Sequence, residues 1–237
     1  MEVIAMDEDN FSELSEERIQ TSVLAKVEKK ALIWLAAKLP TWVTPDMLTY
    51  LGLFAMAWIG ICYYLAKHHW IFLILASVGF AVNWFGDSLD GTLARVRKKE
   101  RPRYGYYIDH LVDAFGITLV ILGISYSKLV HQPFPLIVLA LFLIASINTY
   151  LATHAMNIFK ISYLSLSTTE ARIVLSIFNI ILIFYQEIKL FGLRIFLFDI
   201  VAIIMSLFLL IAILRSAIKN LTILNRKERA KWEEHQN

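Results

Sequence analysis

Residues 70–92 read WIFLILASVGFAVNWFGDSLDGT. An α-helix needs about 20 largely apolar residues to cross the hydrocarbon core of a bilayer, and this stretch is long and apolar enough to do so. Its last turns nevertheless hold two aspartates, Asp87 and Asp90. Carboxylates are costly inside a membrane helix and usually mark a functional site. The stretch therefore predicts a membrane-spanning helix that carries chemistry at one end.

The composition of the whole chain agrees with a membrane protein. Its 237 residues are 58% hydrophobic and 18% charged, with one cysteine, whereas a soluble domain is about 45–50% apolar and about 25% charged. A disordered chain, a disulfide scaffold and a free cytosolic enzyme are poor explanations of this composition. The formal charge of +3 does not suggest nucleic-acid binding, and we expect no nucleic-acid partner. The acidic start, Met1 to Phe11, predicts no cleavable signal peptide.

Apolar segments of the same kind recur along the chain and predict an all-α integral membrane protein with six transmembrane helices. They lie near residues 45–66, 70–92, 106–127, 134–157, 168–187 and 192–215. Cytoplasmic loops carry the excess of Lys and Arg, and the basic residues gather in 26–38, 95–103 and 215–231. We therefore expect a multi-pass protein with both termini, and the loop between the second and third spans, in the cytoplasm.

The chain divides into three predicted parts. Residues 1–40 form an N-terminal segment in which apolar residues recur at helical spacing over 11–40, residues 41–218 form the six-helix transmembrane catalytic domain, and residues 219–237 form a charged cytoplasmic tail. The N-terminal pattern predicts an amphipathic helix lying on the cytoplasmic membrane surface. A helix packed against the protein's own cytoplasmic surface explains the pattern equally well.

Four aspartates fall on two helical stripes that the basic loop 95–103 connects. Asp87 and Asp90 share one stripe with Gly91 and Ala94, and a second stripe holds Gly105, Asp109, Asp113 and Gly116. Two spans joined by a short loop run antiparallel, so both acidic ends should lie near the cytoplasmic surface. Close carboxylates need compensating charge, and oxygen-rich ligation favours two Mg²⁺ or Mn²⁺ ions. Two such ions suit the transfer of a phosphoryl-linked group, and Arg95 could add a phosphate contact.

These residues resemble the signature of the CDP-alcohol phosphotransferases, also called CDP-alcohol phosphatidyltransferases. The string is Asp87-x-x-Asp90-Gly91-x-x-Ala94-Arg95, then nine residues, then Gly105-x-x-x-Asp109-x-x-x-Asp113. The six predicted spans and the N-terminal helix are similar to that family too, so the likeness covers nearly the whole chain. It implies an enzyme of phospholipid synthesis and lipid metabolism, which joins a CDP-linked donor to an alcohol and releases CMP. It also implies a homodimer among membrane lipids.

The resemblance assigns roles residue by residue. Asp87, Asp90 and Asp109 would hold the metals, and Asp113 would both bind metal and act as general base on the attacking hydroxyl. Asp90, Gly91, Ala94 and Arg95 would lie against the cytidine or the diphosphate, and Gly105 completes the motif.

Several further residues are candidates for the same site. Asn83 lies one turn before Asp87 and could contact the nucleotide or support a ligand. Glu170 and Arg172 stand at a predicted helix start, where one of them could line the substrate cavity, although helix capping also explains Glu170. We expect His110 to be a residue at the rim, because it lies off the stripe of Asp109 and Asp113.

A narrower likeness concerns the substrate. The choline/ethanolamine phosphotransferases are resembled by Trp34-Leu35, residues 40–49, Gly52-Leu53, and the pairs Asp109-His110 and Thr169-Glu170. This favours transfer from CDP-choline or CDP-ethanolamine to diacylglycerol, although the chain is much shorter than those enzymes. CDP-diacylglycerol as donor to inositol phosphate, glycerol phosphate or serine is the alternative.

Functions of other classes fit less well. A cation or proton transporter would spread its acids through the depth of the membrane, whereas these gather at one end of two helices. An intramembrane prenyltransferase would need two separate Asp-rich motifs, and a scaffold would need none.

Overall fold

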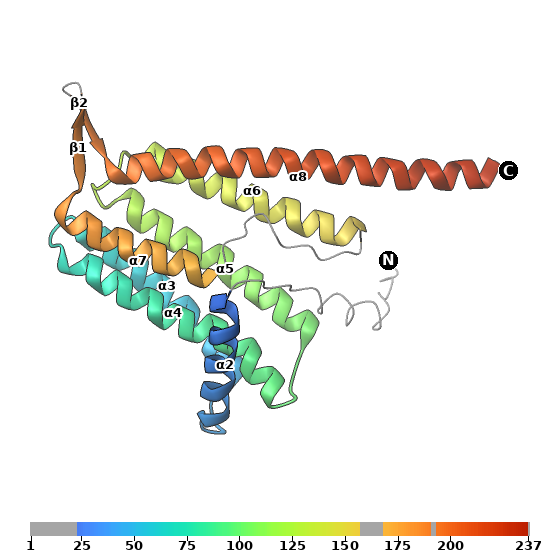
Figure 1. The fold of residues 1–237 in the computed structure, drawn as a ribbon, viewed down its shortest axis with the longest axis horizontal. Coiled ribbons are helices and arrows are strands. Elements are labelled where there is room, and N and C mark those ends of the chain that lie inside the picture. Colours follow the sequence, from blue (N-terminus) through green and yellow to red (C-terminus); the bar gives the residue numbers. More distant parts are fainter. Residues whose placement is uncertain (1–22, 157–167, 191–192, 237) are drawn as a thin grey trace.

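The computed structural model describes residues 23–156, 168–190 and 193–236. Within these residues it has seven helices and one two-stranded hairpin (Figure 1). The elements, in chain order, are α2 (Val23–Lys38), α3 (Pro45–Ala66), α4 (Ile71–Val96), α5 (Pro102–Ser125), α6 (Pro133–Met156), α7 (Thr168–Phe184), β1 (Glu187–Leu190), β2 (Leu193–Phe196) and α8 (Leu197–Gln236).

Five of the described helices are long and apolar enough to cross a membrane, as expected of an integral membrane protein. They are α3, α4, α5, α6 and the part of α8 up to Arg226. The other predicted span, 168–187, corresponds to α7, which has 17 residues. At about 1.5 Å per residue it is about 25 Å long, which is short for a bilayer core of about 30 Å. A sixth crossing therefore stays a prediction.

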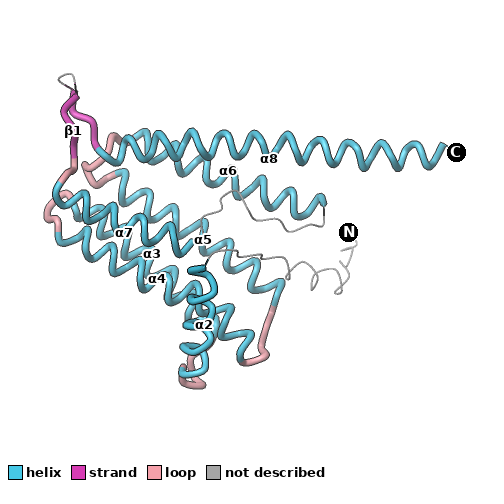
Figure 2. The backbone as a smooth tube through the Cα atoms, viewed as in Figure 1, coloured by secondary structure: helices cyan, strands magenta, loops and turns pink. Residues whose placement is uncertain are grey.

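The prediction of the last span was wrong at its start. Residues 187–190 and 193–196 pair as an antiparallel hairpin, with Glu187 opposite Phe196, and the helix begins only at Leu197. In Glu187-Ile-Lys-Leu190 charged and apolar residues alternate, which is the period of a strand and not of a helix. The hairpin joins α7 to α8 at the end of the bundle away from α2 (Figure 2).

A buried aspartate fixes the start of α8. Asp199 accepts hydrogen bonds from the backbone N–H groups of His131 at 2.8 Å and Phe196 at 3.1 Å. Its second contact with His131 is through the ring Nδ1, at 2.7 Å. This one carboxylate ties the hairpin and the loop between α5 and α6 to the first turn of α8.

Helix α3 lies at the centre of the bundle. It packs against both α4 and α5, while α4 and α5 have few direct contacts with one another. Glycines allow the close approach, since a Cβ on Gly60 would lie 2.5 Å from the carbonyl oxygen of Leu119, and one on Gly123 would overlap the Gly60 carbonyl. The two acidic helices thus approach each other across the end of α3.

Helix α7 is joined to the same bundle by a buried polar chain. The Tyr63 hydroxyl of α3 donates to Oδ1 of Asn179 at 2.8 Å, and Nδ2 of Asn179 donates to the Ser77 hydroxyl of α4 at 3.1 Å. Paired polar groups of this kind fix one register between helices in an apolar environment. Helix α7 therefore lies beside α4, and α6 and α8 pack together next to α5 (Figure 1).

Helix α2 runs across the long direction of the other helices (Figure 1). Its Leu32 and Ala36 are buried against Leu89 and Leu93 of α4, so part of the helix packs on the protein's own surface. Val27 is 62% exposed, and membrane contact by that face stays a prediction. Residues 11–22 of the predicted amphipathic stretch lie outside the described residues.

The charged tail continues α8 without a break. The helix extends through residues 219–236 (Figure 1), and only Asn237 of the tail lies outside the described residues.

Candidate active site

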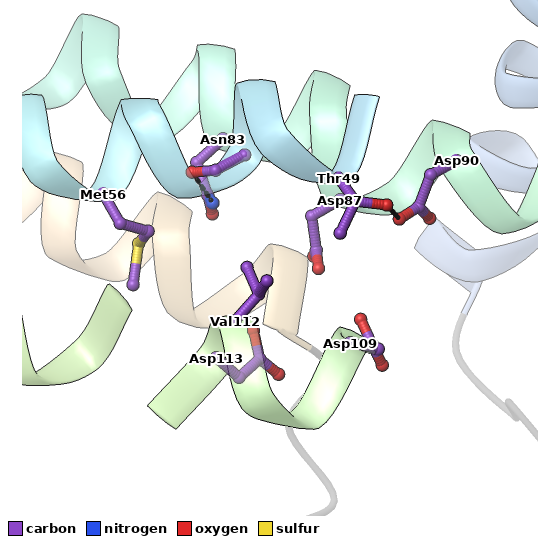
Figure 3. A pocket seen from close by; sticks show the side chains of 9 residues that line it. Thr49, Met56, Asn83, Asp87, Asp90, Asp109, Val112 and Asp113 are labelled. Carbon is purple, nitrogen blue, oxygen red and sulfur yellow. Dashed lines mark hydrogen bonds between the residues drawn. The ribbon is translucent and has the colours of Figure 1, made fainter. Parts of the chain in front are cut away.

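A small pocket opens where α3, α4 and α5 meet, near the α2 end of the bundle. It is lined by Thr49, Gly52 and Met56 of α3, by Asn83, Asp87 and Asp90 of α4, and by Asp109, Val112 and Asp113 of α5 (Figure 3). All four aspartates singled out in the sequence therefore line one pocket.

Helices α3 and α4 are in very close contact beside the pocket. A Cβ on Gly86 would lie 2.6 Å from the carbonyl oxygen of Leu48 and 2.7 Å from the backbone nitrogen of Gly52. Glycine at this position lets the two backbones touch directly beside Asp87. The sequence predicted antiparallel acidic helices, but it did not predict that a third helix lies between them.

The contact with α3 supplies a partner for Asp90. The hydroxyl of Thr49 donates to Oδ2 of Asp90 at 2.6 Å, and the backbone N–H of Gly91 donates to Oδ1. Both contacts fix the rotamer of the carboxylate. Thr49 was not predicted from the sequence as a site residue. The available signal was its position in the first span, one turn before Gly52.

Asp87 has a different partner, which comes from α7. The Arg172 guanidinium forms an ion pair with Asp87 through Nη2, and its Nε donates to Oδ1 of Asn83 at 2.8 Å. The Asn83 amide in turn donates to the Gly52 carbonyl at 3.1 Å. Of the two residues considered at the start of α7, Arg172 is thus the one that reaches the acidic residues.

Glu170 is not among the residues that line the pocket. Its neighbour Thr169 instead donates to Oε1 of Glu28 on α2 at 2.6 Å, and the same oxygen accepts from the Trp84 indole at 2.7 Å. These contacts connect the start of α7 with α2 and α4 just outside the pocket.

The remaining motif residues also lie outside the pocket lining, which does not include Gly91, Ala94, Arg95 or Gly105. A Cβ on Gly91 would meet nothing nearer than Nη2 of Arg95 at 3.9 Å, and one on Gly105 would meet nothing within 4 Å. Packing among the described residues therefore does not require glycine at either position. Arg95 Nη2 donates to the Thr92 hydroxyl at 3.3 Å.

His110 is not among the residues that line the pocket, but its ring lies beside Asp109, which is. Its ring Nδ1 is 3.5 Å from Oδ2 of Asp109, and the ring packs between Tyr106 and Tyr150, with centroids 4.2 Å and 5.2 Å away. Asp109, His110 and Asp113 offer ligand atoms that all lie within 4.8 Å of one another. This group could hold a metal ion, and it includes His110, which lies off the stripe of Asp109 and Asp113.

The donor set of the pocket fits a hard divalent cation. Four carboxylates line it, and carboxylate oxygens are the ligands that Mg²⁺ and Mn²⁺ prefer. Asp87 and Asp90 are held by hydrogen bonds to one oxygen or both, as aligned metal ligands usually are.

The fold and the pocket define a helical membrane protein with a polar, acidic site between its spans. The family profile of the CDP-alcohol phosphatidyltransferases matches residues 42–214, which is most of the chain, and the protein belongs to this family. It is therefore a transferase of phosphorus-containing groups that acts in phospholipid synthesis from a CDP-alcohol, in a family that uses divalent cations. A comparison with curated proteins gave no match.

Proposed function

We propose that the pocket between α3, α4 and α5 is the active site for transfer of a substituted phosphate from a CDP-linked donor to an alcohol hydroxyl. The observation that carries this proposal is the meeting of Asp87, Asp90, Asp109 and Asp113 at one pocket (Figure 3). Acids spread through the membrane depth would have favoured ion transport, whereas these four gather at one level.

The four aspartates would hold two divalent cations, Mg²⁺ or Mn²⁺. Bound there, the cations would offset the charge of the diphosphate and stabilise the charge that develops during an in-line displacement. Thr49 keeps Asp90 in a fixed orientation, so this ligand is organised in advance.

Asp113 is the proposed general base. It accepts the proton of the attacking hydroxyl, the hydroxyl oxygen bonds to the phosphorus distal to cytidine, and the bond from that phosphorus to the CMP oxygen breaks. A carboxylate can act as this base because a nearby metal ion would lower the pKa of the attacking hydroxyl. Asp113 belongs to α5, on the side of the pocket opposite Asp87 (Figure 3).

The family motif supplies the remaining contacts. Gly91 and Ala94 would let the donor approach the α4 backbone, Arg95 would contact the diphosphate, and Gly105 would leave room beside α5. The open space next to Gly91 and Gly105 supports this assignment. Asn83 lines the pocket and would contact the donor, while Glu170 is proposed only for the outer part of the substrate cavity.

The proposed substrates are CDP-choline or CDP-ethanolamine as donor and diacylglycerol as acceptor. The support is a likeness to the choline/ethanolamine phosphotransferases at Trp34-Leu35, residues 40–49, Gly52-Leu53, Asp109-His110 and Thr169-Glu170. The alternative is a CDP-diacylglycerol donor with a polar alcohol such as inositol phosphate, glycerol phosphate or serine. We also propose that the active site faces the cytoplasm and that the enzyme is a homodimer.

CMP release by the purified protein with Mg²⁺ tests the reaction and separates the substrates. Release from CDP-choline or CDP-ethanolamine that requires diacylglycerol would support the favoured donor. Release from CDP-diacylglycerol alone would assign the alternative, and the polar acceptor would then be found with a panel of alcohols. No CMP from any donor, with metal and acceptor present, would contradict the proposed function.

A further inference from the structure

Arg172 stands out among the basic residues because its guanidinium forms an ion pair with Asp87, one of the four pocket aspartates. It comes from α7, whereas the family motif lies on α4 and α5. Its side chain is only 14% exposed, so the charge is placed in a poorly solvated environment next to carboxylates.

The Arg172 guanidinium contacts α4 through two of its nitrogens. Nε binds Asn83 and Nη2 binds Asp87, and these two residues are one helical turn apart on the same face. The ion pair uses Oδ2 of Asp87, an oxygen that a divalent cation would otherwise be able to take. The positive charge also lowers the electrostatic attraction of the pocket for any further cation.

The third guanidinium nitrogen, Nη1, differs from the other two. Nη1 of Arg172 is buried and makes no hydrogen bond within the described part of the structure. Buried donors are nearly always satisfied by protein, water or ligand. Two nitrogens of the Arg172 guanidinium bind residues of α4, and the third, Nη1, is left to donate to an anionic oxygen of a ligand.

We propose that Arg172 is the resident counter-cation of the acidic pocket. It holds Asp87 until divalent cations bind, and it makes their binding depend on the anionic donor, whose diphosphate provides a new partner for the guanidinium. This inference rests on the metal role proposed above for the four aspartates. Arg172 is a positioning residue here, and takes no proton in the reaction.

Mn²⁺ binding to the purified full chain tests this directly, with and without CDP. Arg172→Gln removes the charge but keeps a hydrogen-bonding side chain, and without CDP it should bind Mn²⁺ about tenfold more tightly than the wild type, or about 1.4 kcal/mol. CDP should tighten Mn²⁺ binding more in the wild type than in the variant. The control Arg194→Gln makes the same change on the distant hairpin and should leave Mn²⁺ affinity unchanged.

Thermal unfolding provides a second readout. Without metal, Arg172→Gln should melt at a lower temperature than the wild type, because Asp87 loses its counter-charge. Saturating Mn²⁺ should raise its melting temperature more than that of the wild type.

A second substitution covers the case in which Arg172→Gln does not fold. Arg172→Lys keeps the charge but cannot bridge Asn83 and Asp87 together, so its Mn²⁺ affinity without CDP should stay within about threefold of the wild type. A tenfold gain in Arg172→Lys, or equal or weaker Mn²⁺ binding in Arg172→Gln, would overturn the inference.

A double variant separates this inference from the proposed function. Asp109→Asn with Asp113→Asn should abolish Mn²⁺ binding in both the wild-type and the Arg172→Gln backgrounds. Binding that survives the double change would refute the metal assignment and, with it, the role of Arg172. Binding that is lost there, but is not tightened by Arg172→Gln, would refute only the role of Arg172.

Discussion

At the scale of single residues, the hydroxyl of Thr49 is the least expected part of the site. It donates to Asp90 at 2.6 Å, and a hydrogen bond to a charged group is worth about 1.5–3 kcal/mol. Thr49→Val, which keeps the shape and removes the donor, should lower the rate of CMP release about tenfold or more. Thr49→Ser keeps a hydroxyl and should retain most activity. Equal losses in both variants, measured by initial rates, would mean that the methyl group matters and the hydrogen bond does not.

Asp87 and Asp90 should behave differently from the proposed base. Replacing either by Ala removes a proposed metal ligand, so binding of metal and nucleotide should fall together. Mg²⁺-dependent binding of CDP, measured by calorimetry, checks this. Tight Mg²⁺-dependent CDP binding by Asp87→Ala or Asp90→Ala would remove that residue from the ligand set.

At the scale of the helices, two glycines on α4 should separate packing from function. A Cβ on Gly86 would overlap the α3 backbone, whereas one on Gly91 would meet no atom nearer than 3.9 Å. Gly86→Ala should destabilise the protein by about 1–3 kcal/mol through overpacking. Gly91→Ala should leave the melting temperature unchanged or higher, because alanine favours helix, yet reduce activity by filling space meant for the donor. A thermally fragile Gly91→Ala protein would contradict this division.

Helix α2 should depend on a different residue of α4. Arg97 donates to the backbone carbonyls of Leu39 at 3.1 Å and Pro40 at 2.8 Å, and to that of Val43, so it fastens the connection between α2 and α3. Arg97→Gln should speed tryptic cleavage at Lys38 several-fold, while Lys98→Gln, the same change at an exposed neighbour, should not. Identical cleavage rates in the two variants would show that the Arg97 hydrogen bonds do not hold the connection between α2 and α3.

At the scale of the whole molecule, the number of crossings depends on α7. The hairpin after α7 lies at the end of the bundle away from α2 (Figure 1), which favours a crossing. Since the native Cys62 is buried, a cysteine at Lys99 or at Lys189 would be the reactive one. We expect an impermeant maleimide to label Lys99→Cys and Lys189→Cys from opposite sides of sealed vesicles. Labelling of both from one side would leave α7 without a crossing.

The sequence predicted much of this molecule because the strongest signals were local. Apolar runs separated by short connections located α3 to α6 closely, and the i, i+3 and i, i+4 spacing of the aspartates predicted which side chains share a face. Contacts between distant elements were beyond its reach. The insertion of α3 between the acidic helices depends on glycine backbones that meet in three dimensions, and Arg172 is 85 residues away from Asp87. The hairpin was missed because a four-residue strand is short beside two apolar helices.

The most direct test compares wild-type and Asp113→Asn proteins in one experiment that measures both CMP formation and binding of the CDP donor. If the pocket is the active site and Asp113 the base, Asp113→Asn should lose about 10²- to 10⁴-fold in rate, the usual range for a general base. Its donor affinity should change only slightly. Near-normal CMP formation by Asp113→Asn would contradict the assignment, whatever its donor affinity.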